Sequence, residues 1–191
     1  MTRTDTPEDL SGKLLIAMPG MGDPRFSNAV VFLCAHSGDG AMGIIVNKPV
    51  PDLSLDDLLE QLEIDRGKGS AGVGVFFGGP VEGGRGFVLH SSDYEGNPGS
   101  LKVTEGFAMT ATKDILVDIA QGNGPEAVLA ALGYAGWGPG QLENEVRRNA
   151  WLMVDADAAI VFGPDIGGKW AKALRKLGID PSMLSSGGGR A

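Results

Sequence analysis

Residues 28–36 read NAVVFLCAH and residues 41–47 read AMGIIVN, and the tetrapeptide SGDG at residues 37–40 joins them. Both runs are rich in β-branched and apolar residues, which favour strands. Glycine and aspartate between two such runs are typical of the tight turn of a β-hairpin. We therefore predict an antiparallel hairpin here, and this pair of strands decides the class of fold.

The hairpin turn also matches the dinucleotide-binding pattern G-x-G-x-x-G, at Gly38, Gly40 and Gly43. A dinucleotide site needs a helix directly after this pattern, because the helix N-terminus holds the pyrophosphate. Residues 44–46 are instead Ile-Ile-Val and continue a strand. We interpret the match as hairpin chemistry and predict no cofactor.

Outside the hairpin, short apolar runs predict strands and longer periodic runs predict helices. The predicted strands are residues 13–18, 74–77, 86–91, 101–104, 107–111, 151–154 and 159–162. A first helix is predicted to begin after the N-cap Ser54, with Asp57 as its capping-box partner. Further helices are predicted at residues 112–121, 125–132, 141–148 and 168–177. Strands and helices do not alternate strictly, which predicts an α+β fold with a mainly antiparallel sheet and flanking helices.

The length of 191 residues is enough for one well-buried core. A content of 42% hydrophobic and 21% charged residues is ordinary for a globular protein. No internal repeat or linker divides the chain. We predict one domain at residues 13–184, a polar lead at residues 1–12 and a flexible glycine-rich tail at residues 185–191.

Charge and cysteine content argue against several classes of protein. The chain has 16 lysine and arginine residues against 24 aspartate and glutamate residues, a net charge of -8, which disfavours direct nucleic-acid binding. The single cysteine, Cys34, allows no intramolecular disulfide and fits a reducing compartment. No run approaches the ~20 apolar residues of a membrane span, so we expect a cytoplasmic protein with no membrane partner.

Cys34 and His36 stand two residues apart on a predicted strand, so we expect their side chains on one face. A metal site would need at least two more ligands, and only His90 and carboxylates remain for that purpose; we predict no metal. As a nucleophile, Cys34 has no flanking signature and lies in the core-like run FLCA. A buried structural cysteine is therefore favoured.

A second candidate region begins at Gly78 and Gly79 and continues through Arg85 to His90. Two glycines at a strand end allow another backbone or a ligand to approach closely. In the functional interpretation, Arg85 binds an anion and His90 titrates near neutral pH. In the structural interpretation, the segment is a tight turn with a solvated arginine and a strand-end histidine. The sequence leaves both open.

Loop residues complete the candidate surface. Asp23 and Arg25 precede the hairpin, and they either pair with each other or line the same region as Asn47 at the end of the hairpin. A surface ion pair usually contributes ~0–1 kcal/mol, so the pair alone does not indicate a function.

In the last helix, Lys169 and Lys172 are predicted on the solvated face.

Several segments together carry a family resemblance. They are LIAMP (15–19), DPRF (23–26), GAMG (40–43), NKP (47–49), GGPV (78–81), RGFVLH (85–90), LGYAGWGPGQLE (132–143) and WL (151–152). In combination they resemble the YqgE/AlgH family of small bacterial cytosolic proteins, over nearly the whole chain after its first ten residues. The resemblance implies an antiparallel sheet curved into a barrel-like form. It implies no defined activity, although the AlgH name carries a proposed role in transcriptional regulation of exopolysaccharide synthesis.

Two functions remain open. The first is a non-enzymatic regulatory or binding module, with a protein or small-molecule partner held by loops on a rigid scaffold. Its candidate residues are Asp23, Arg25, His36, Asn47, Gly78, Gly79, Arg85 and His90. The second is a small hydrolase or transferase acting on an anionic metabolite, with Arg85 as the anion contact and His36 or His90 as general base. No complete set of nucleophile, base and orienting group can be assembled from the sequence, so no catalytic residue is assigned.

Overall fold

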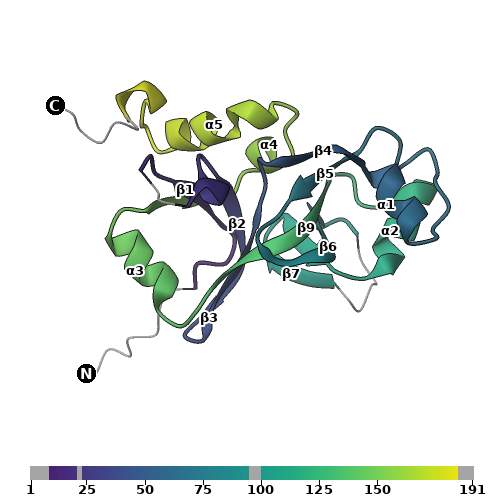
Figure 1. The fold of residues 1–191 in the computed structure, drawn as a ribbon, viewed down its shortest axis with the longest axis horizontal. Coiled ribbons are helices and arrows are strands. Elements are labelled where there is room, and N and C mark those ends of the chain that lie inside the picture. The colour runs from purple at the N-terminus through teal and green to yellow at the C-terminus, as the bar shows by residue number, and fades with distance from the viewer. Residues whose placement is uncertain (1–8, 21–22, 95–99, 185–191) are drawn as a thin grey trace.

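The computed structural model describes residues 9–20, 23–94 and 100–184 (Figure 1). The predicted tail at residues 185–191 and most of the predicted lead at residues 1–12 lie outside the described residues. Within the described ranges, no helix is both long and apolar enough to cross a membrane.

Ten strands form the framework of the described chain. They are β1 (Lys13–Ala17), β2 (Val30–Ser37), β3 (Gly40–Ile45), β4 (Pro49–Ser54), β5 (Gly74–Phe77), β6 (Val81–Ser91), β7 (Ser100–Thr104), β8 (Phe107–Thr110), β9 (Val128–Trp137) and β10 (Trp151–Asp155). The predicted hairpin is β2–β3, and Ser37 pairs with Gly40 next to its turn. Gly40 has a φ of 136°, which favours glycine at this position.

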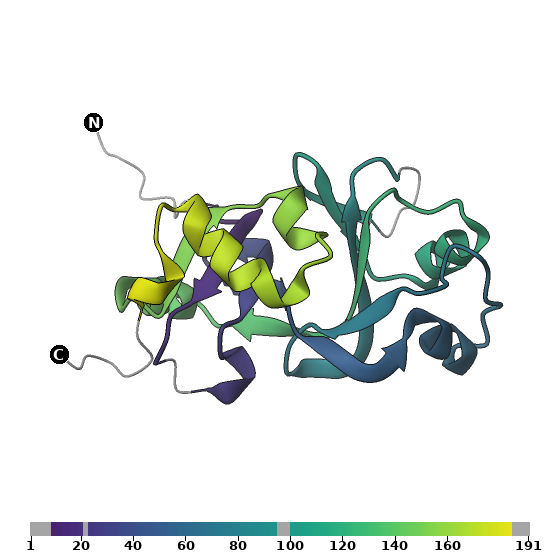
Figure 2. The same ribbon diagram turned by 90° about the horizontal axis from the view of Figure 1, so that it is seen from above.

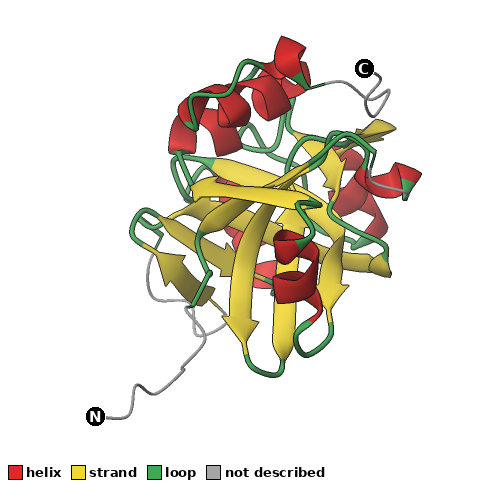
Figure 3. Ribbon diagram, turned by 90° about the vertical axis from the view of Figure 1, so that its left-hand side faces the viewer, coloured by secondary structure: helices red, strands yellow, loops and turns green. Residues whose placement is uncertain are grey.

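The strands are neighbours in the order β10-β1-β2-β3-β9-β6-β8-β7, and β4 and β5 attach beside β9. Of the strand pairs formed by the described residues, β5–β9 is parallel and the others are antiparallel. β9 pairs with three strands, β3, β5 and β6, and it runs from the part of the molecule that holds β6 and β7 to the part that holds β1 and β2 (Figure 1). The sheet curls round on itself (Figure 3). The predicted α+β class with a curved, mainly antiparallel sheet is confirmed.

Five α-helices flank the sheet within the described residues. They are α1 (Leu55–Gln61), α2 (Lys113–Gln121), α3 (Gln141–Arg147), α4 (Ala158–Val161) and α5 (Lys169–Lys176). The predicted capping box of α1 is present, because the Ser54 hydroxyl accepts from the Asp57 N–H and the Asp57 carboxylate accepts from the Ser54 N–H. Seen from above, α5 crosses over β1 at one end of the molecule, and α1 and α2 lie at the other end (Figure 2).

The side chains of β2 alternate between two buried clusters. Phe32 packs into the first cluster with Ile16, and Leu33 packs into the second with Leu15. Because both faces are buried along residues 30–34 of β2 and residues 43–45 of β3, these parts of the hairpin are apolar instead of alternating between apolar and polar residues. A third cluster lies under α1 and α2 and includes Leu59.

Two predicted elements are wrong in type. Residues 125–132 were predicted as a helix, but Val128–Trp137 is strand β9. Alanine and leucine favour a helix locally, yet pairing with three strands outweighs this weak preference, and Gly133 adopts a φ of +76° that a helix does not accommodate. Residues 159–162 were predicted as a strand, but Ala158–Val161 is the short helix α4, capped by the Asp157 carboxylate, which accepts from the Ala159 N–H.

Lys169 was predicted on the solvated face of α5, but only 1% of its surface is exposed, so this prediction is wrong. Its ammonium group donates to the carbonyl oxygens of Val46 (2.9 Å) and Val161 (2.6 Å) and lies 5.1 Å from the centroid of the Phe76 ring. The periodicity of α5 predicts which residues share a face but not which other elements cover that face. Here the end of α4 packs against Lys169, because Val161 is the last residue of α4. The side chain of Lys172 is 42% exposed, as predicted, and its Nζ lies 3.4 Å from Oδ2 of Asp165.

Candidate functional site

A β-bulge separates Cys34 from His36. The pairing of β2 with β3 shifts between Leu33 and Ala35, so the extra residue reverses the alternation of side chains. Cys34 packs into the first core cluster, and burial there raises the pKa of its thiol to about 12. His36 instead faces the second cluster, beside Leu10. The prediction that these two side chains share a face is therefore wrong, and the predicted buried cysteine is confirmed.

The hydrogen bonds of His36 determine which ring nitrogen carries the proton. Nδ1 accepts from the backbone N–H of Leu10 at 3.1 Å, and Nε2 lies 3.2 Å from Oε2 of Glu143. Because a backbone N–H can only donate, Nδ1 has no proton, and Nε2 donates to the carboxylate. The pKa of Glu143 is below its usual value, first because its own backbone N–H donates to the carboxylate and then because of His36. Both nitrogens of this almost fully buried ring are thus engaged within the protein.

His90 is engaged in the same way at another place. Nδ1 lies 2.8 Å from the carbonyl oxygen of Ser91, which can only accept, so Nδ1 carries the proton. Nε2 then accepts from the hydroxyl of Thr110 at 2.8 Å, and the Thr110 oxygen accepts from Ser100 at 2.6 Å. His90 is completely buried, and this burial is the main cause of a pKa below the ordinary histidine value. The predicted strand-end histidine is therefore a core residue.

The buried His90 predicts a loss of stability in mild acid. Its pKa in the folded protein lies below the ordinary value of 6.5, so the unfolded chain binds the proton more readily. The free energy of unfolding should be fully retained above pH ~6.5 and should fall as the pH drops from there through the lowered folded pKa. Urea denaturation at several pH values between 7.5 and 5 measures this slope.

His90→Gln should flatten that slope, whatever its effect on stability at pH 7.5. Hydrogen bonds from Ser54 to Asp57 and from Lys13 to Asp155 lower the pKa of these carboxyls below the ordinary aspartate value, so they do not contribute in this window. An equally steep slope in His90→Gln would show that another group causes the acid sensitivity.

The two histidines do not meet. His90 pairs with Val128 at the beginning of β9, whereas His36 pairs with Ala41, which in turn pairs with Trp137 at the end of β9. Nearly the whole of β9, residues 128–137, therefore separates the positions beside which the two histidines lie. No single site can use both rings.

Arg85 is positioned by a bulge in β6. Val81 pairs with Tyr134 of β9 and Gly86 pairs with Leu132, so residues 82–85 on β6 lie opposite a single residue of β9. Such a bulge redirects side chains and is common next to functional sites. The guanidinium of Arg85 lies 5.1 Å from the centroid of the Phe87 ring, and its side chain is 55% exposed.

The ion pair that Arg85 makes is a weak one. One guanidinium nitrogen lies 3.8 Å from the carboxylate of Glu82, whose side chain is 50% exposed. Exposed pairs of this kind contribute ~0–1 kcal/mol. An anionic ligand can therefore replace Glu82 at little cost.

A groove of about 730 Å³ lies between the β2–β3 hairpin and the β6 bulge, and we call it the hairpin groove. Its floor contains aromatic and sulfur-containing side chains, and its rim contains charged ones. The aromatic and sulfur-containing side chains include Met42, Phe87, Met109, Tyr134 and Trp137. The charged side chains are Asp39, Glu82 and Arg85. Its volume is in the range of small-molecule sites. Of the candidate residues, the groove brings together His36 and Arg85.

Gly78 and Gly79 have a structural role outside the lining of the hairpin groove. A Cβ on Gly78 would lie 2.3 Å from the carbonyl oxygen of Gly133, and a Cβ on Gly79 would lie 2.0 Å from the carbonyl carbon of Tyr134. The close approach that the two glycines allow is therefore the crossing of β9.

Asn47 also contacts the chain itself: its side chain accepts from the Val30 N–H and donates to the Asn28 carbonyl.

Asp23 and Arg25 pair with each other. The Asp23 carboxylate accepts from the backbone N–H and from two guanidinium nitrogens of Arg25, at 2.7–3.2 Å. The guanidinium is the largest cause of a lowered pKa for Asp23, and the backbone N–H is the next. The pair lies at the short 3-10 helix Pro24–Phe26 and does not line the hairpin groove.

Sequence reasoning placed residues 78–90 in the candidate surface but did not single out Glu82 or Phe87, and it left Met109 outside. Phe87 and Met109 belong to apolar strand patterns that are typical of a core, and Glu82 stands in a polar turn. The bulge that gathers them depends on the pairing of β6 with β9, for which the sequence contains no local signal. Among the described residues, no three histidine, cysteine, aspartate or glutamate side chains are grouped so that they could hold a metal.

Comparisons with known proteins agree with this architecture. The AlgH-like family model matches residues 14–182. A UPF0301 protein of Ruegeria pomeroyi is 61% identical over 184 residues, which is 96% of this chain and 100% of the relative. The solution structure of the AlgH protein from Pseudomonas aeruginosa is 40% identical, covers 100% of both chains and has a TM-score of 0.79. A Corynebacterium diphtheriae protein of known structure shares the fold at 19% identity, with a TM-score of 0.72 over 92% of this chain and 90% of that one.

Proposed function

The chain belongs to the AlgH-like family, and from this premise and the geometry of the site we propose that it is a non-enzymatic regulatory binding module. Its ligand or partner docks in the hairpin groove and presents a negative group to Arg85. The groove supplies apolar floor, aromatic edges and one exposed guanidinium, which together are suited to recognition.

The observation that carries this proposal is the state of the two imidazoles. A general base needs a free ring nitrogen within hydrogen-bond reach of its substrate. His36 and His90 each have both nitrogens engaged by described protein groups, and His90 is fully buried. Cys34 is buried with a pKa raised to about 12, so its thiolate is scarce at neutral pH. Of the charged residues that line the groove, Asp39, Glu82 and Arg85, the guanidinium of Arg85 is the group that binds anions, and it transfers no protons.

A regulatory role would be an indirect one. The net charge of -8 opposes a tight grip on nucleic acid, so we place the partner of this cytosolic module among proteins and anionic small molecules. A role in transcriptional regulation, which the family resemblance implies, would then act through that partner.

Arg85→Ala should weaken ligand binding without affecting the fold. A thermal-shift screen with nucleoside phosphates and phosphorylated metabolites provides the measurement. A ligand at 100 times its Kd stabilises a protein by about 2.7 kcal/mol, or about 5–10 °C in Tm for a chain of this size. Loss of a charge-assisted hydrogen bond should weaken binding by more than about tenfold and reduce this shift.

Arg66→Ala is a matched control. Arg66 is also exposed, with 61% of its side chain accessible, and also pairs with a carboxylate, that of Glu60 at 3.2 Å, but it does not line the hairpin groove. Arg66→Ala should keep the full shift. Equal shifts in both variants would remove the groove from consideration, and turnover of a screened metabolite by the wild type would favour the alternative, a hydrolase or transferase.

A further inference from the structure

A second, smaller pocket opens beside Arg85, between α1, α2 and the strands β6 and β9, and we call it the α1–α2 pocket. Its volume is about 170 Å³, and its walls are mainly apolar. The apolar lining includes Leu58, Leu62, Phe87, Val88, Leu116 and Leu132. Leu58 and Leu62 are partly exposed, so the pocket leaves hydrocarbon surface in contact with solvent, which a bound apolar group would cover.

The charged residues that line this pocket are both cationic. They are Arg85 on the β6 bulge and Lys113 at the start of α2, and no acidic residue joins them in the lining. In a chain with a net charge of -8, this local reversal of sign favours an anionic group at the pocket. Two carboxylates stand next to these cations: Glu82 pairs weakly with Arg85, and Asp114 follows Lys113 in the first turn of α2.

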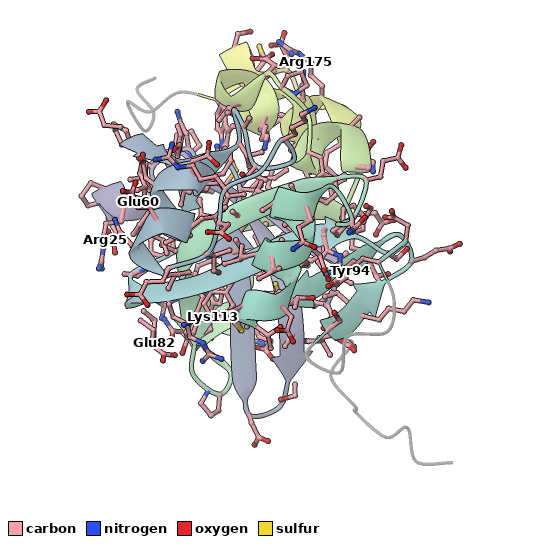
Figure 4. All side chains as sticks on the ribbon, turned by 90° about the vertical axis from the view of Figure 1, so that its right-hand side faces the viewer. Arg25, Glu60, Glu82, Tyr94, Lys113 and Arg175 are labelled. Carbon is pink, nitrogen blue, oxygen red and sulfur yellow. The ribbon has the colours of Figure 1, made fainter. Side chains whose placement is uncertain are left out.

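Helix stability does not explain the position of Lys113. A cation in the first turn of a helix is disfavoured by the positive end of the helix dipole. Lys113 is exposed and forms no ion pair with the described residues. Figure 4 shows Lys113 on the same face as Glu82 of the β6 bulge. Its ammonium group is thus available to a ligand at the pocket.

The size of the pocket limits the apolar part of that ligand. A dry apolar cavity of about 150 Å³ is known to hold a benzene ring, which has six carbons. The hydroxyl of Thr110, which also lines the pocket, is already bonded to His90 and Ser100. The walls therefore select hydrocarbon, and the specificity for charge comes from Arg85 and Lys113.

We propose that the α1–α2 pocket binds a small carboxylate with a hydrocarbon body of about six carbons, held at its head by Lys113 and Arg85. The inference rests on the proposed function in one respect, the use of Arg85 as an anion contact. It adds a site of its own, because Lys113 and Leu62 line the α1–α2 pocket and not the hairpin groove.

Titration of the full chain with sodium hexanoate, followed by methyl NMR, tests this site. We expect saturable shifts at the leucine and valine methyls of the pocket, and affinity that rises about fourfold for each methylene from butanoate to hexanoate. Lys113→Gln should weaken hexanoate binding by about threefold to tenfold, because it removes one charge from an exposed position. Hexan-1-ol, which has the same number of carbons and no charge, should bind the wild type and Lys113→Gln equally.

Two further variants separate the alternatives. Lys68→Gln, a change at an exposed lysine that does not line the pocket, should bind hexanoate like the wild type. Leu62→Trp should fill the pocket and abolish binding of hexanoate and hexan-1-ol alike. Equal affinities of Lys113→Gln and the wild type, or no saturation by 50 mM hexanoate, would overturn the inference.

The same measurements distinguish its failure from that of the proposed function. If the hairpin groove is wrong and the α1–α2 pocket is right, hexanoate binding depends on Lys113 while the thermal-shift screen shows no dependence on Arg85. If the reverse holds, Arg85→Ala loses its screened ligand and hexanoate does not bind.

Discussion

Gly79→Ala should lower the free energy of unfolding by more than about 4 kcal/mol, a loss that is exceptional for a single methyl group. Gly79 has a φ of +155°, and an added Cβ would lie 2.0 Å from the carbonyl carbon and 2.2 Å from the carbonyl oxygen of Tyr134. These are backbone atoms of β9, so they cannot move aside as a flexible side chain would. Domains of this kind are stable by only about 5–15 kcal/mol, so the substitution should remove a large share of the total stability.

Gly83→Ala is the matched control for this result. Gly83 stands four residues further on, in the β6 bulge, and an added Cβ would have no heavy atom within 4 Å. Its free energy of unfolding, measured in urea, should stay within about 0.5 kcal/mol of that of the wild type. If Gly79→Ala unfolded at the same urea concentration as Gly83→Ala, the crossing of residues 78–79 with β9 would not be as close as the structure shows.

Lys169→Met should lower the free energy of unfolding by about 2–4 kcal/mol at pH 7. Methionine fills nearly the same volume, but it leaves the carbonyl oxygens of Val46 and Val161 buried without a donor, each at a cost of about 1–3 kcal/mol. Part of this cost is offset because the ammonium group no longer has to be buried. Lys172→Met, on the exposed face of the same helix, should change stability by less than about 1 kcal/mol.

The difference between wild type and Lys169→Met should also depend on pH. Burial lowers the pKa of Lys169 from 10.5 to about 8, with a smaller effect from Lys172. Between these two values the unfolded chain binds more protons, so the wild type gains stability as the pH rises, by at most about 3 kcal/mol, and Lys169→Met lacks this gain. A difference between the two proteins that stays constant from pH 7 to 10 would show that Lys169 has the same pKa in the folded and unfolded states.

The strand β9 links these structural predictions to the proposed sites. It crosses Gly79 on one side, pairs with the Arg85 bulge on another, and ends at the β2–β3 hairpin. The hairpin groove and the α1–α2 pocket are both lined by residues of β9 and both include Arg85. A change that disturbs β9 should therefore affect both sites, whereas Arg85→Ala and Lys113→Gln act on exposed side chains and leave the framework intact.

Local sequence signals predicted those elements whose structure depends on near neighbours. The β2–β3 hairpin follows from apolar runs around SGDG, and α1 follows from the capping box of Ser54 and Asp57, because both patterns act within a few residues. The same reasoning was wrong for β9, where AVLAALG has helical composition but three partner strands take up its backbone hydrogen bonds. It was also wrong for Lys169, whose burial is caused by elements distant in the chain.

By itself, the sequence determined the α+β class, the central hairpin, the buried Cys34 and the family. It also singled out Arg85 as a candidate anion contact, because a guanidinium binds carboxylate and phosphate groups through paired hydrogen bonds. Only the tertiary structure decided that His36 and His90 are engaged and lie far apart, that Gly78 and Gly79 accommodate a strand crossing, and that Arg85 borders two cavities. The physical reason is that side-chain direction in a strand reverses with each bulge, and the bulges depend on pairing between distant segments.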